Sequence, residues 1–88
     1  MRNYDLVLKF LAGATTGKGS NLYIDDNKLI NYSTCIAFRK DSRTIVLNGQ
    51  RYSQTTSIHQ NRIRRDTVGS KLIEIDTEED FYNYIRNC

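Results

Sequence analysis

Two apolar runs joined by a polar turn stand in the middle of the sequence, TCIAFRKDSRTIVLNG (residues 34–49). The runs Cys35–Phe38 and Ile45–Leu47 are rich in β-branched and aromatic residues, which favour strands. The pair Asp41-Ser42 between them favours a turn, and Asn48-Gly49 after the second run is a strong tight-turn signal. The segment therefore predicts a β-hairpin and an antiparallel sheet.

A second hairpin is predicted just before the first. Residues 21–25 hold Leu22 and Ile24, Asp26-Asn27 provides a turn, and residues 28–32 return with Leu29 and Ile30. A short further strand fits residues 51–53, and Leu72, Ile73 and Ile75 predict a last strand over residues 71–76. We expect four to five strands.

Three helices are predicted around these strands. The first has Asn3 as its cap, Gly13 as its stop and an apolar face made by Leu6, Val7, Phe10 and Leu11. The second covers residues 55–66, and the third begins after Thr77 and carries Phe81, Tyr84 and Ile85 along one face. Residues 13–20, with three glycines, are expected to be a flexible loop. The prediction is one α+β domain over residues 1–88: a small antiparallel sheet packed with an N-terminal, a central and a C-terminal helix.

Length and composition narrow the class of protein. Eighty-eight residues, 39% hydrophobic and 26% charged, are ordinary for a small globular chain. No apolar run approaches the roughly 18 residues that a membrane span needs, and no secretory signal is recognisable. We therefore expect no membrane partner and a cytoplasmic location, where Cys35 and Cys88 would stay free thiols.

Catalytic and metal-binding motifs are weak. The segment GATTGKGS (residues 13–20) differs in spacing from a phosphate-binding loop and lacks the Ser or Thr directly after its lysine. His59 is the single histidine, and no serine or cysteine has an evident base beside it. Three or four metal ligands of the right type are not found together. We expect no enzyme activity, no metal and no cofactor; a small enzyme that uses His59 is the remaining alternative.

Charge is distributed unevenly along the chain, whose overall net charge is +3. Residues 39–71 contain eight basic and two acidic side chains, whereas residues 72–88 contain one basic and five acidic side chains. A basic middle segment can attract phosphate or an acidic protein surface. The alternative is a solvated basic face that pairs with the acidic end of the chain.

The central helix is the main candidate for a binding surface. At 100° per residue, Ile58 and Ile63 would face inward with His59 between them, which leaves four amide and guanidinium side chains outside: Gln60, Asn61, Arg64 and Arg65. Such groups hydrogen-bond base edges, phosphates and carboxylates. The hydroxyls and backbone N–H groups of Thr55, Thr56 and Ser57 would offer a phosphate seat at the helix start, and further cations would extend the patch: Arg39, Lys40, Arg43 and Arg51. Tyr52 is expected in the core. The alternative interpretation is a solvated helix whose arginines confer solubility.

The segment YSQTTSIHQNRIRR (residues 52–65) also resembles a block found in small, uncharacterised proteins of phages and other mobile elements in low-GC bacteria. Residues 29–39 resemble a second, weaker block of the same family, and the resemblance covers roughly residues 3–68. It implies a non-enzymatic protein that acts stoichiometrically on a host complex, as inhibitors of CRISPR nucleases do.

Two binding hypotheses follow, besides the enzyme. In the first, the protein binds and inhibits a host protein or nucleoprotein complex in the bacterial cytoplasm, and an acidic face occupies a cationic nucleic-acid groove: Glu74, Asp76, Glu78, Glu79 and Asp80. In the second, the basic central helix binds DNA or RNA directly through Gln60, Asn61, Arg64 and Arg65.

Overall fold

The computed structural model describes residues 2–87, so Cys88 and its expected free thiol lie outside the described residues. Its elements, in chain order, are α1 (Asn3–Leu11), β1 (Thr16–Lys18), β2 (Leu22–Asp25), β3 (Lys28–Asn31), β4 (Thr34–Asp41), β5 (Thr44–Asn48), α2 (Gln54–Asp66), β6 (Lys71–Ile75) and α3 (Glu78–Arg86). The α+β class, the three helices and both hairpins are confirmed. None of these helices is long and apolar enough to cross a membrane.

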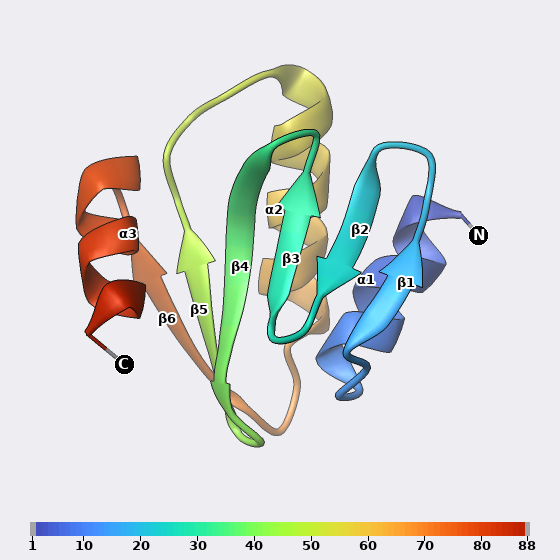
Figure 1. Cartoon of the computed structure of the whole chain (residues 1–88), viewed down its shortest axis with the longest axis horizontal. Coiled ribbons are helices and arrows are strands. Elements are labelled where there is room, and N and C mark those ends of the chain that lie inside the picture. Colours follow the sequence, from blue (N-terminus) through green and yellow to red (C-terminus); the bar gives the residue numbers. More distant parts are fainter. Residues whose placement is uncertain (1, 88) are drawn as a thin grey trace.

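The strands form one sheet in the order of the sequence, from β1 to β6 (Figure 1). Strands β1 to β5 are antiparallel neighbours, whereas β6 pairs with β5 in parallel, with Ile45 opposite Leu72. A parallel neighbour requires a crossover, and α2 provides it. The prediction of a purely antiparallel sheet was therefore wrong at its last strand.

The strand count was also too low. The sheet has six strands, and the additional edge strand β1 lies in the glycine-rich segment that was expected to be a flexible loop. A Cβ added at Gly17 would lie 2.6 Å from a methyl carbon of Leu6, so glycine allows β1 to lie close to α1. No strand forms at residues 51–53, which belong to the loop between β5 and α2.

Two apolar clusters place the helices on opposite faces of the sheet. One cluster joins α1 and α2 to the sheet through Leu6, Phe10 and Ile63, and the other joins α3 to it through Phe81. The amphipathic pattern of α1 is confirmed, because Leu6, Val7 and Phe10 are fully buried. Its predicted cap is wrong: Asn3 is the first helical residue, and its side chain contacts Ser20 and Asn21 instead.

Two helix ends, the end of α1 and the start of α3, lie where the sequence signals predicted them. Gly13 follows α1 with a φ of 107°, a left-handed conformation that favours glycine. Thr77 caps α3, since its hydroxyl oxygen accepts a hydrogen bond from the backbone N–H of Asp80 at 3.2 Å.

Candidate functional site

The central helix is rotated relative to the prediction. Ile63 and His59 are buried as expected, but Ile58 is 44% exposed and Gln60 only 3% exposed. The prediction that Ile58 faces inward and Gln60 outward was therefore wrong. The side-chain N–H groups of Gln60 donate to the backbone carbonyls of Asn48 (2.7 Å) and Gln50 (3.0 Å), and these hydrogen bonds compensate for the loss of water on burial.

The start of α2 also differs from the predicted phosphate seat. Ser53 caps the helix and accepts the backbone N–H of Thr56, so this N–H is already occupied. The Thr56 hydroxyl is buried and donates to the Asn31 carbonyl oxygen at 2.6 Å. Thr55 stays exposed beside them. The backbone N–H of Ser57 also donates, to the Ser53 carbonyl at 3.0 Å, so three donors of the expected seat are used inside the fold.

His59 belongs to a buried polar network rather than to an exposed site. Its Nε2 lies 3.1 Å from the side-chain oxygen of Asn21, which also accepts hydrogen bonds from Asn3 and Asn31. Because that oxygen can only accept, Nε2 donates and Nδ1 is left as a buried acceptor without a partner among the described residues. Burial, helped by the charge of Arg62, lowers the pKa of His59 and so favours the neutral ring.

A small polar pocket nevertheless brings five of the predicted residues together. This cavity of about 210 Å³, here called the α2 pocket, lies between the loop after β5 and one side of α2, and it is lined by Gly49, Arg51, Ser57, Gln60, Asn61 and Arg64. The four α2 residues stand at i, i+3, i+4 and i+7, which is one helix stripe. Gly49 had no predicted role beyond its turn signal.

Arg64 is fixed in this pocket by an ion pair across the crossover. Its Nε and one terminal nitrogen donate to the two carboxylate oxygens of Glu74 at 2.8 and 2.9 Å, and its other terminal nitrogen donates to Asn61 at 2.7 Å. The hydrogen bonds from Arg64 lower the pKa of the Glu74 carboxyl. Glu74 therefore serves the α2 pocket and does not belong to the predicted acidic face.

Arg65 lies apart from the pocket. It pairs with Asp66 at 3.2 Å and, together with Arg62, packs against the ring of Tyr4, at 5.4 and 5.0 Å from the ring centre. The three side chains join α1 to the outer side of α2. Arg65 remains exposed, but its guanidinium is already engaged on this surface.

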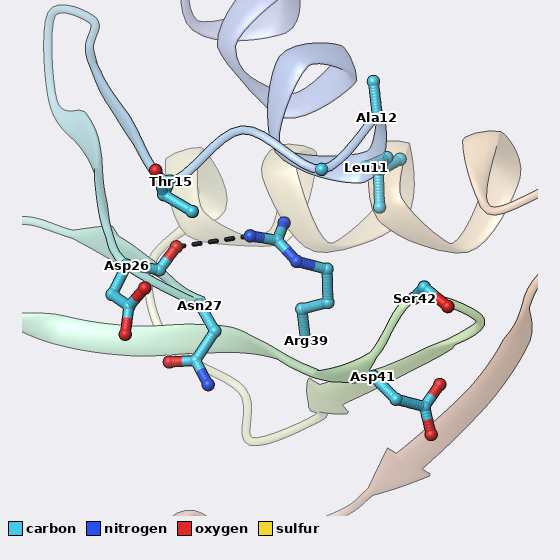
Figure 2. A pocket seen from close by; sticks show the side chains of 9 residues that line it. Leu11, Ala12, Thr15, Asp26, Asn27, Arg39, Asp41 and Ser42 are labelled. Carbon is cyan, nitrogen blue, oxygen red and sulfur yellow. Dashed lines mark hydrogen bonds between the residues drawn. The ribbon is translucent and has the colours of Figure 1, made fainter.

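A larger cavity of about 450 Å³ opens at the end of α1, between the turns that join β2 to β3 and β4 to β5 (Figure 2). Arg39 extends into it and donates to the backbone carbonyls of Phe10 (2.6 Å), Ala14 (2.9 Å) and Asp26 (3.3 Å). Its guanidinium also lies 4.9 Å from the centre of the Phe10 ring. The expected role of Arg39 in a surface patch is thus replaced by a structural one, because it caps the Phe10 carbonyl in the last turn of α1 and joins it to the carbonyls of Ala14 and Asp26.

The other predicted cations do not form one surface. Lys40 contacts the ring and hydroxyl of Tyr84 on α3, whereas Arg43 and Arg51 are exposed. These two arginines lie beyond opposite ends of β5, a strand of five residues that spans roughly 17 Å. The basic middle segment is therefore dispersed over several parts of the molecule.

Four of the five predicted acids do gather, at the start of α3. This acidic corner consists of Asp76, Glu78, Glu79 and Asp80, and none of them forms an ion pair within residues 2–87. Glu78 is partly enclosed, its N–H donates to Gln50, and it lies near Tyr52, whose pKa burial raises to about 12. Tyr52 is half-buried, with its hydroxyl accepting from Asn48.

No group of three or more His, Cys, Asp or Glu side chains in the described part of the chain is placed to hold a metal ion. Cys35 is buried, and burial raises the pKa of its thiol to about 11. At that pKa the thiol is protonated near neutral pH and is a poor nucleophile.

Comparison with known proteins identifies one family. Residues 9–82, which make up most of the chain, match the model of a family of unknown function, DUF8033. No curated protein and no solved structure matches the chain.

Proposed function

This chain belongs to the DUF8033 family, and we propose that it is a non-enzymatic accessory protein of phage type that binds and inhibits a host macromolecular complex. The target we favour is a nucleic-acid-handling defence complex of the bacterial cytoplasm, as for anti-CRISPR proteins. The resemblance of residues 52–65 to phage proteins supports the phage type, and the positions of the charged side chains support the mode of binding.

The observation that carries this proposal is the contrast between three engaged guanidiniums and a cluster of acids that form no ion pair within residues 2–87. Arg39, Arg64 and Arg65 all have acceptors within the protein. The acidic corner, in contrast, places four carboxylates within five positions at one exposed end of the molecule. Positively charged grooves that track nucleic-acid backbones are complementary to such a cluster.

The acids at the start of α3 also interact favourably with the helix dipole, which explains their place in the fold. That interaction leaves Asp76, Glu79 and Asp80 exposed to solvent, so their charges remain available to a partner. Steering by an unpaired charge cluster raises the association rate, and the effect weakens with salt. The proposed complex should therefore form more slowly as ionic strength rises.

A phage-interference assay in bacteria with an active CRISPR nuclease tests the proposal. The chain should restore phage growth, and neutralising the exposed acids with Asp76→Asn, Glu79→Gln and Asp80→Asn should abolish this effect. A matched triple variant, with Asp5, Asp25 and Asp26 each changed to Asn, has the same change in net charge elsewhere. Equal activity of both triple variants would contradict the proposed role of the acidic corner.

A further inference from the structure

The α2 pocket contains more hydrogen-bonding capacity than the fold uses. Within residues 2–87, Arg51 has no hydrogen-bond or ion-pair partner, and neither does the hydroxyl of Ser57 or the side-chain N–H₂ of Asn61. Arg64 donates three N–H groups to Glu74 and Asn61, and because a guanidinium has five, two remain. Unused donors from the loop and from two turns of α2 thus converge on one cavity.

The position of the pocket in the topology is also typical of ligand sites. Strands β5 and β6 are parallel and α2 connects them, and Gly49 directly follows β5 at the pocket's edge. Ligands of parallel sheets bind beyond the carboxyl ends of the strands, next to the helix that follows. A Cβ at Gly49 would lie 2.9 Å from a carboxylate oxygen of Glu74, so glycine keeps this wall of the pocket close to the ion pair.

Charge and size define the ligand. Glu74 is neutralised by Arg64, so the positive charge of Arg51 remains, and the free groups on Arg51, Ser57 and Asn61 can all donate. The cavity of about 210 Å³ is below the roughly 300–1,000 Å³ of sites for drug-sized molecules. These features suit a compact anion with several acceptor oxygens.

We propose that the α2 pocket binds one phosphate-type oxyanion, held between the guanidinium of Arg51 and the donors of Ser57, Asn61 and Arg64. The sources of such a group are a terminal phosphate and the phosphodiester backbone of a nucleic acid. The α2 pocket shares no residue with the acidic corner, so variants at one site leave the residues of the other unchanged and either proposal can fail without the other.

Titration of the isotope-labelled protein with inorganic phosphate, at ionic strength held constant with chloride, tests the site by NMR. Backbone amide signals of Gly49, Arg51, Ser57 and Asn61 should shift and saturate. Arg51→Gln should weaken binding about tenfold, the equivalent of about 1.4 kcal/mol. Asn61→Asp, which keeps the size of the side chain but adds a negative charge, should abolish binding.

Arg43→Gln is the matched control, since Arg43 is an exposed arginine beyond the other end of β5, and it should bind phosphate like the unmodified chain. Absence of saturable shifts, or equal weakening in Arg43→Gln and Arg51→Gln, would overturn the proposal. A thymidine oligonucleotide with and without a 5′-phosphate then separates the sources. Shifts with both forms assign the site to the backbone, and shifts with the phosphorylated form alone assign it to a terminal phosphate.

Discussion

Replacing Arg39 with methionine should destabilise the domain by about 2–3 kcal/mol. Methionine keeps the unbranched apolar stem of arginine but removes the guanidinium and its three hydrogen bonds, of which those to Phe10 and Ala14 are short, at 2.6 and 2.9 Å. Hydrogen bonds to a charged group contribute roughly 1.5–3 kcal/mol each, and a cation over an aromatic ring adds about 0.5–1 kcal/mol at an exposed site. Since Arg39 lines an open cavity, water can reach part of the freed carbonyls, which reduces the total.

Urea unfolding followed by circular dichroism measures this loss. The midpoint concentration should fall while the slope of the transition stays unchanged, because the surface exposed on unfolding is the same. For a domain of this size, a loss of 2–3 kcal/mol lowers Tm by roughly 10–20 °C. Arg39→Lys should be intermediate, since one ammonium keeps the charge but cannot span acceptors on both α1 and the β2–β3 turn.

Arg43→Met is the matched control, because Arg43 is exposed and its side chain has no partner within the described residues. Its effect should stay within about 0.5 kcal/mol of zero, as for ordinary surface changes. If Arg39→Met were no more destabilising than Arg43→Met, the structural role of Arg39 would be refuted and its charge would be available for binding.

Three further predictions concern ionisable groups. A double-mutant cycle on Arg64→Gln and Glu74→Gln should give a coupling of about 0.5–1 kcal/mol, since the pair is bidentate but about one third exposed; a coupling of zero in urea unfolding would contradict the pairing. Because the pKa of His59 is lower in the folded protein, the unfolded chain takes up the proton at a higher pH than the folded protein does as the pH is lowered. The contribution of neutral His59 to the free energy of unfolding is therefore present above about pH 6.5. Below that pH the free energy of unfolding falls by up to about 1.4 kcal/mol per pH unit until the folded pKa is reached. His59→Gln should flatten the dependence measured between pH 5 and 6.5, and an unchanged slope would show that another group causes it. In a Cys88→Ser background, the Cys35 thiol should react with a disulfide reagent at pH 8 far more slowly in the folded than in the unfolded protein, as expected for a buried thiol with a pKa of about 11; equal rates would contradict its burial.

Local signals in the sequence predicted the fold correctly where a residue's structural role depends only on its neighbours along the chain. Thr77 before three acids predicted the start of α3, and Gly13 predicted the end of α1. The apolar runs of the two hairpins predicted β2 to β5 because adjacent antiparallel strands need only a short turn. The pairing of β6 with β5 is different, since it depends on a crossover of more than twenty residues that leaves no local trace.

The candidate site was predicted less well because its side chains meet partners that are distant in the sequence. Helix α2 has only two isoleucines, Ile58 and Ile63, so its apolar pattern does not define which side faces the sheet. The buried side was decided by Gln60, which finds backbone carbonyls in the loop after β5. Likewise, the carbonyls that accept hydrogen bonds from Arg39 come from three separate segments, and counting the basic residues along the chain cannot reveal them.

Co-purification from host cells tests the role of the acidic corner most directly. The tagged chain should retain a host protein or nucleoprotein complex in stoichiometric amount, the variant with Asp76→Asn, Glu79→Gln and Asp80→Asn should lose it, and the matched variant at Asp5, Asp25 and Asp26 should keep it. Recovery of the same complex by the acidic-corner variant, or of nucleic acid without any protein, would contradict the account.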